Sequence, residues 1–137
     1  MDKVEHIGIA VRDISEAGER FTKLLNTTAY KTETVESEGV ITMFFQVGET
    51  KIELLQATHE DSPIAKFIEK KGEGIHHIAF GVDSCSQEIQ RLMAENFTMI
   101  HEQAKQGADN KMIAFLHPKS CHGVLTEICS EKENEGS

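Results

Sequence analysis

The sequence predicts an α+β fold built from two βαβββ modules, and two repeated features of the chain carry this prediction. A strand-like run with a histidine inside it occurs twice, as VEHIGIAV and IHHIAFGV, so that His6 aligns with His77. Towards the end of each half, the runs KIELL and LTEIC align Glu53 with Glu127. Apolar residues are the default in such strands, so the repeated ionisable groups indicate a duplicated module with a chemical role.

The first module is expected over residues 3–57. After its first strand, Asp13 and Glu16 have the spacing of a capping box, which predicts the start of a helix. The segment ITMFFQVGETKIELLQA then predicts two strands joined by a turn at Gly48. The apolar residues of the predicted helix follow at helical spacing: Ala17, Phe21, Leu24 and Leu25.

The second module is expected over residues 74–130 and repeats this order. Ser84 and Gln87 take the capping positions before an amphipathic run, which predicts the second helix. The segment MIAFLHPKSCHGVLTEICS then predicts two strands joined by a longer loop. Together the two modules are expected to form one domain over residues 1–130.

A short helix is predicted between the modules, over residues 62–71. Ser62 is a suitable N-cap, Pro63 suits the first helical position, and Gly72 is a typical stop. At the other end of the chain, residues 131–137 are polar and charged, so a flexible tail is expected there.

Composition narrows the functional classes. The 137-residue chain has a net charge of −9, which argues against general nucleic-acid binding. It has no apolar run long enough to span a membrane and no signal-peptide pattern, and its three cysteines form no CxxC pair, so a cytoplasmic protein with reduced thiols is expected. An anionic small ligand remains compatible with the sequence, because Lys105, Lys111 and Lys119 lie in one acid-poor stretch.

The repeated histidines and glutamates predict a metal site. Alternate strand residues face opposite sides, so His6 and, by the repeat, His77 are expected to face a cavity, whereas His76 faces elsewhere. Glu53 and Glu127 lie in apolar strands, where a buried charge is normally paired or bound to metal. Two imidazoles and two carboxylates suit a divalent ion such as Co, Mn, Ni, Zn or Mg.

Each of these residues also has a simpler interpretation. A single strand histidine or glutamate is usually a satisfied core group or a surface group, and only the repetition favours the metal. Lys119 suits either an anionic carboxylate or phosphate or a solvated turn. Packing or solvent contact is preferred for the groups without a repeat: His59, His101, His122, Lys66, Lys70 and Lys71.

The segments EHIGIAV, DSPIAKFIEKKGEGIHHIAFGV and FLHPKSCHGVLTEI resemble the methylmalonyl-CoA epimerases, a family of the vicinal oxygen chelate superfamily that also includes glyoxalase I. The resemblance extends over nearly the whole chain, from about Val4 to Ile128. It implies a homodimer in which the two modules of each chain form a cup around one metal ion. The metal ligands that it implies are His6, Glu53, His77 and Glu127.

The resemblance further implies interconversion of (R)- and (S)-methylmalonyl-CoA through a metal-stabilised enolate, a reaction of propionate metabolism with an acyl-CoA thioester as substrate. Inversion requires proton transfer on both faces of C2. Glu127 is expected to act as one acid/base. Some epimerases carry a further glutamate where this chain has Thr42, so the second acid/base stays open between Glu53 and a lysine-held water. Lys119 is the candidate for contact with coenzyme A.

Three alternatives share the implied fold. A lactoylglutathione lyase of the glyoxalase I type would use the same metal chemistry, and an iron dioxygenase would use two histidines and one carboxylate. The additional glutamate and the HPKS segment argue against both. A drug-sequestering module would need no metal, and the repeated histidines and glutamates argue against it.

Overall fold

The computed structural model describes residues 1–132, which form two compact units. One unit contains His6–His76, and the other contains Met1–Glu5 together with the described residues from His77 onward. Most of the predicted tail lies outside the described residues, although its first residue, Glu131, is the last residue of a strand. None of the helices within residues 1–132 combines the length and hydropathy needed to cross a bilayer.

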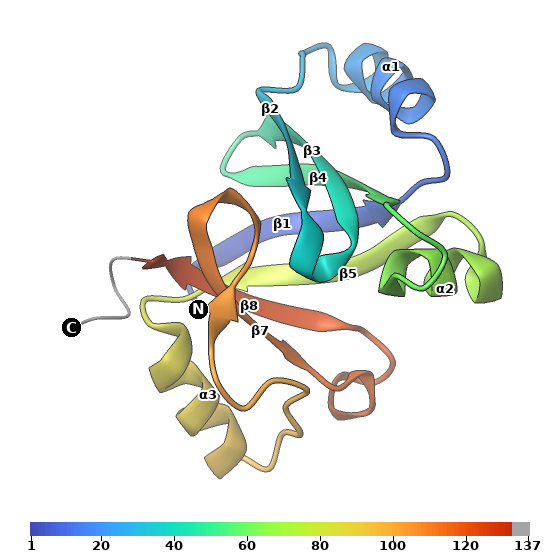
Figure 1. Ribbon diagram of the computed structural model, residues 1–137. Helices are drawn as coiled ribbons and strands as arrows, with labels where there is room; N and C mark the ends of the chain where they lie inside the picture. The colour runs from blue at the N-terminus through green and yellow to red at the C-terminus, as the bar shows by residue number, and fades with distance from the viewer. Residues whose placement is uncertain (133–137) are drawn as a thin grey trace. The chain divides into compact units, whose positions relative to one another are not determined.

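The His6–His76 unit has the predicted βαβββ order, followed by the predicted additional helix (Figure 1). Its strands lie in the order β2-β3-β4-β1, with β1 parallel to β4 and the other neighbours antiparallel. Its elements are β1 (Lys3–Ala10, from His6 on), α1 (Ile14–Leu25), β2 (Lys31–Val35), β3 (Val40–Val47), β4 (Thr50–Ala57) and α2 (Pro63–Lys71).

The other unit repeats the same arrangement. Its strands lie in the order β5-β8-β7-β6, and again the first strand is parallel to the last one. The βαβββ order predicted for the second half is therefore confirmed. Its elements are β5 (Gly74–Gly81, from His77 on), α3 (Cys85–Ala94), β6 (Lys105–Gln106), β7 (Lys111–Leu116) and β8 (Thr126–Glu131).

The helices begin at the residues that the capping patterns predict. Asp13 accepts hydrogen bonds from the backbone N–H groups of Ser15 and Glu16, at 3.0 and 3.1 Å. Ser84 caps α3 in the same way, and Ser62 caps α2 ahead of Pro63. These bonds satisfy amides that the first helical turn leaves without an intrahelical partner, so the cap residues fix where each helix starts.

Replacing Asp13 with alanine is expected to lower the free energy of unfolding by about 1 kcal/mol, because two amides lose their acceptor. In thermal denaturation this corresponds to a decrease of about 3–5 °C in the melting temperature. Glu19→Ala, at an exposed site of the same helix, is the matched control. Equal melting temperatures for the two variants would contradict a capping role for Asp13.

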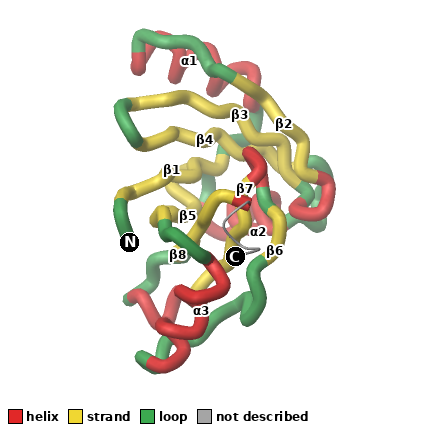
Figure 2. The backbone as a smooth tube through the Cα atoms, turned by 90° about the vertical axis from the view of Figure 1, so that its left-hand side faces the viewer, coloured by secondary structure: helices red, strands yellow, loops and turns green. Residues whose placement is uncertain are grey.

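α1 packs on one face of the first half-sheet, over β3 and β4 (Figure 2). An apolar cluster fills the space between the helix and the sheet. It contains Phe21 of the helix together with Ile9 and Val11, as the alternation along the first strand predicts. Leu24 was expected on the apolar face but is 72% exposed. The physical reason is that the buried residues of the helix are Ile14 and Gly18, and Leu24 falls outside this stripe in the last turn.

α2 packs on the opposite face of the same half-sheet. Ile64 of this helix clusters with Ala10 of β1 and Leu55 of β4. Ala10 has the same strand parity as His6, and Leu55 has the same parity as Glu53, so all four side chains share one face. α2 therefore covers the face that carries the candidate metal ligands of this unit, whereas α1 covers the other face.

Candidate metal centre

His6 and Glu53 form a buried pair in the His6–His76 unit. The His6 Nδ1 atom lies 3.2 Å from Glu53 Oε2, and the two residues are 5% and 6% exposed. In the parallel register of β1 and β4, the residue beside Glu53 is Gly8. Because glycine has no side chain, the Glu53 carboxylate can extend along the strand to His6.

His77 and Glu127 form the equivalent pair in the other unit. The His77 Nε2 atom lies 3.0 Å from Glu127 Oε1, and the two residues are 6% and 4% exposed. The residue beside Glu127 in the parallel register of β5 and β8 is Ala79, the counterpart of Gly8. A small side chain at this position leaves space between the carboxylate and the imidazole, as it does in the first pair.

His76, which was predicted to face away from His77, is half-buried. Its ring meets the ring of Phe67 edge to face, with 4.9 Å between centroids. His76 therefore contacts Phe67 of α2.

A phenylalanine stands opposite each glutamate across the neighbouring antiparallel strand. Phe44 of β3 pairs in register with Glu53, and Phe115 of β7 pairs with Glu127. The ring of Phe115 also meets His77 edge to face, with 5.4 Å between centroids. Sequence reasoning missed these two residues as parts of the site, although the repeat that aligns the histidines also aligns the phenylalanines.

A second aromatic residue flanks each phenylalanine. Tyr30 lies 5.7 Å from Phe44 between ring centroids, and His101 lies 5.8 Å from Phe115. His101 Nδ1 also accepts a hydrogen bond from the Phe115 backbone N–H at 3.2 Å. His101 thus supports the strand opposite Glu127, in keeping with the structural role preferred for it, and His122 ends a 3₁₀ turn in a left-handed conformation.

The donor atoms of both pairs are suited to a divalent cation. Each pair offers one imidazole nitrogen and one carboxylate oxygen in a buried setting, where a charged carboxylate needs compensation. The separations of 3.2 and 3.0 Å are short enough for both atoms of a pair to bind one ion at about 2.0–2.2 Å, and they also permit a hydrogen bond within each pair.

Two lysines of the acid-poor stretch, Lys111 and Lys119, lie at opposite ends of β7. Lys111 begins β7 and forms an ion pair with Glu131, whereas Lys119 lies beyond the other end of this strand. Lys119 is exposed on the 3₁₀ turn Pro118–Cys121, and its backbone N–H donates to His117 Nδ1 at 3.1 Å. Its contact with coenzyme A stays a prediction.

Thr42 lies opposite Leu55 and shares the face of Glu53, with 1% exposure. Its hydroxyl cannot serve as a base at neutral pH. Thr42 therefore does not replace the glutamate that some epimerases carry at this position.

Comparison with known proteins identifies relatives along most of the chain. Residues 5–115 match the model of the Glyoxalase/Bleomycin resistance protein/Dioxygenase superfamily. The chain is 40% identical to the uncharacterized protein YqjC of Bacillus subtilis, over 98% of this chain and 96% of the relative. It is 36% identical to the mitochondrial methylmalonyl-CoA epimerase of Homo sapiens, over 93% of this chain and 73% of the relative.

Solved structures extend the similarity to the fold. A methylmalonyl-CoA epimerase in complex with methylmalonyl-CoA and NH4+ is 32% identical to the chain, covers 97% of it and 96% of its own length, and has a TM-score of 0.92. The α+β fold of two βαβββ modules and the resemblance to the epimerases, both predicted from the sequence, are confirmed.

Proposed function

Because the chain belongs to the Glyoxalase/Bleomycin resistance protein/Dioxygenase superfamily, we propose that it is a metal-dependent methylmalonyl-CoA epimerase that interconverts the (R)- and (S)-epimers. The observation that carries the proposal is the pair of buried, equivalent His–Glu contacts, one in each repeated module. The prediction of an enzyme of the epimerase type is confirmed by the relatives, which include an enzyme solved with methylmalonyl-CoA.

We assign the cation to His6, Glu53, His77 and Glu127 acting together, with one ion for the four side chains. The donor chemistry supports this assignment, since neutral imidazole and carboxylate suit Co, Mn, Ni, Zn or Mg. When bound, the ion supplies Lewis acidity that stabilises the negative charge developing on the thioester oxygen as the C2 proton leaves.

Glu127 is proposed to move the proton on one face of C2. Its carboxylate takes the C2 proton, and the electron pair of the C–H bond moves towards the thioester carbonyl. The surroundings of the pair support this role: Phe115 lies opposite Glu127 in the strand register and its ring contacts His77, so an apolar ring borders the pair. Return of the proton from the same face restores the starting epimer.

Inversion requires a proton donor on the opposite face of C2. Glu53 is the proposed donor, because it is the equivalent buried carboxylate of the other module. A water held by a lysine is the alternative that the sequence left open. The acyl-CoA thioester is the proposed substrate, and the homodimer and the cytoplasmic location stay predictions.

The proposal is tested by proton exchange. In deuterated buffer, the protein loaded with cobalt or manganese is expected to replace the C2 proton of methylmalonyl-CoA with deuterium, and treatment with EDTA is expected to abolish the exchange. Loss of the C2 proton signal in the NMR spectrum measures it.

Absence of exchange with every one of the five candidate metals would overturn the epimerase proposal. Isomerisation of a glutathione hemithioacetal by the same sample would instead identify a lactoylglutathione lyase. Tight binding of a small aromatic drug by inactive, metal-free protein would identify a sequestering module.

A further inference from the structure

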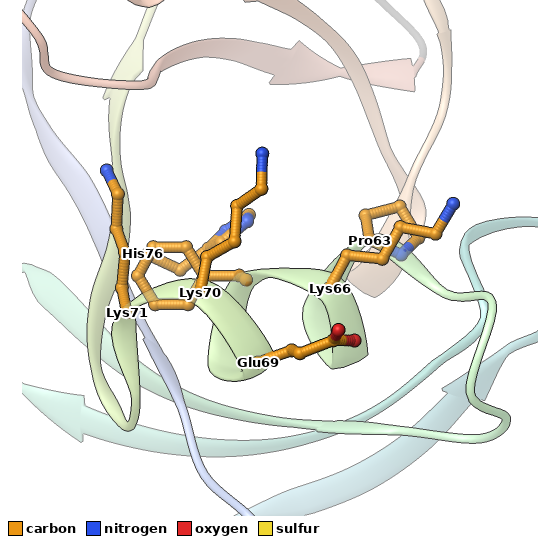
Figure 3. Close-up of a pocket in the computed structure, with 7 residues that line it drawn as sticks. Pro63, Lys66, Glu69, Lys70, Lys71 and His76 are labelled. Carbon is orange, nitrogen blue, oxygen red and sulfur yellow. The ribbon is translucent and has the colours of Figure 1, made fainter.

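A hollow lined by cationic side chains lies along α2 in the His6–His76 unit. We call it the α2 hollow, and the residues that line it are Pro63, Lys66, Phe67, Glu69, Lys70, Lys71 and His76. Figure 3 shows the three lysines projecting to the same side of the helix, and Glu69 is the one carboxylate among the lining residues. The hollow therefore concentrates positive charge on a chain whose net charge is −9.

The three lysines have no anionic partner in the described part of the chain. Lys66, Lys70 and Lys71 are exposed, and none of them forms an ion pair with a carboxylate of residues 1–132. Lys66 and Lys70 are one helical turn apart, a spacing at which like charges destabilise a helix slightly. A bound anion would relieve this repulsion, so the arrangement favours an anionic ligand.

The ring of Phe67 contacts two of the other groups that line the hollow, His76 and Lys71. His76 meets Phe67 edge to face, with 4.9 Å between ring centroids. The Lys71 ammonium lies 5.8 Å from the centre of the same ring, within cation–π range. Phe67 thus positions an imidazole and an ammonium group on the same hollow, which a purely solvated helix face would not require.

The position of α2 connects this hollow with the candidate metal ligands of the same unit. Ile64 seats the helix on Leu55, which is two residues from Glu53 along β4 and shares its face. Two strand residues correspond to about 7 Å. The helix that carries the hollow therefore packs on the same face of the half-sheet that carries Glu53.

We propose that the α2 hollow binds the phosphate groups of the coenzyme A portion of the substrate. This inference rests on the proposed epimerase function, because coenzyme A carries its phosphates at the far end of a long pantetheine arm from the thioester. Ammonium groups bind phosphate oxygens through charge-assisted hydrogen bonds.

Lys70 and Lys71 have another possible use, since cations in the last turn of a helix stabilise its dipole. Lys66 lies outside that turn, so a helix-stabilising role does not account for it. The test therefore needs a binding measurement beside a melting temperature.

The first experiment measures binding of free coenzyme A by calorimetry, with no turnover required. The double variant Lys66→Gln/Lys70→Gln is expected to raise the Kd for coenzyme A about 10-fold or more, with the melting temperature within about 2 °C of the wild type. Lys23→Gln, on the exposed side of α1, is the matched control and is expected to leave the Kd unchanged. An unchanged Kd in the double variant would overturn the inference.

Parallel titrations with adenosine 3′,5′-bisphosphate and with inorganic phosphate identify the source of the phosphate. Weaker binding of the bisphosphate by the double variant supports recognition of the nucleotide end. An effect of the double substitution on inorganic phosphate alone, with none on coenzyme A, would mean a general anion site and would overturn the assignment to coenzyme A.

The second experiment separates this inference from the proposed function. With methylmalonyl-CoA, the double variant is expected to raise KM about 10-fold at unchanged kcat. With methylmalonyl-pantetheine, which lacks the nucleotide, the variant and the wild type are expected to behave alike. If the wild type has no epimerase activity, the proposed function is refuted, and calorimetry still tests binding of coenzyme A in the hollow. If the wild type is active and the double variant has the same KM for methylmalonyl-CoA, only the proposed binding in the hollow is refuted.

Discussion

Replacing Glu127 with glutamine is expected to reduce both deuterium exchange at C2 and epimerisation by about a thousandfold or more. The glutamine amide has nearly the same shape as the carboxylate but cannot accept the C2 proton, and a positioned acid/base contributes about 10²–10⁴ in rate. The change also removes a buried charge beside His77 Nε2, which is 3.0 Å from Glu127 Oε1 in the wild type. Proton NMR in deuterated buffer and an assay of the opposite epimer measure the two effects.

The metal content of this variant separates proton transfer from metal binding. A variant that retains the ion but exchanges no proton identifies Glu127 as an acid/base, whereas loss of the ion identifies a mainly ligating role. Glu131→Gln is the matched control, because this residue lies on the same strand but is exposed and paired with Lys111. Exchange within tenfold of the wild-type rate in Glu127→Gln would contradict the proposed role.

The parts of the fold that depend on local sequence could be predicted. The caps at Asp13, Ser62 and Ser84 were recognisable because a side-chain acceptor and the amide that it satisfies lie within three residues. The burial of the four candidate ligands could also be predicted, since strand alternation and the repeat place His6, Glu53, His77 and Glu127 on inward faces, whereas the contacts His6–Glu53 and His77–Glu127 come from the structure. Gly8 and Ala79, two residues after His6 and His77, are small residues on the same strand faces as the histidines.

Features that depend on register between distant strands could not be predicted in this way. Phe44 and Phe115 stand opposite the glutamates only because β3 pairs with β4 and β7 with β8 in a particular register. Similarly, the apolar stripe of α2 indicated a buried side but not which face of the half-sheet it would cover. The lysines opposite that stripe, Lys66 and Lys70, therefore have the sequence pattern of an ordinary solvated face. Only the packing of α2 on the Glu53 side of the half-sheet relates them to the site.

Replacing His77 with alanine is expected to weaken metal binding at least about 100-fold and to abolish activity. Imidazole is a principal ligand for Co, Ni and Zn, and its removal leaves the Glu127 carboxylate without its neighbouring nitrogen donor. Titration of metal-free protein monitored by calorimetry gives both the affinity and the number of ions bound per chain. Phe115→Leu, which removes the ring contact with His77 but no donor atom, is the matched control and is expected to retain the ion.

The number of ions per chain is the more decisive result of this titration. If the four side chains share one ion, the wild type binds one ion per chain, and His77→Ala and His6→Ala each abolish binding at concentrations that saturate the wild type. If each His–Glu pair instead acts alone, the wild type binds two ions and each variant retains one. A bound ion also stabilises the folded state according to its concentration and affinity. With one shared ion, the metal-dependent rise in melting temperature should disappear in both histidine variants. With one ion per pair, the rise should persist in both. A shared ion would turn the two modules into a single catalytic site, because each His–Glu pair supplies one imidazole and one carboxylate.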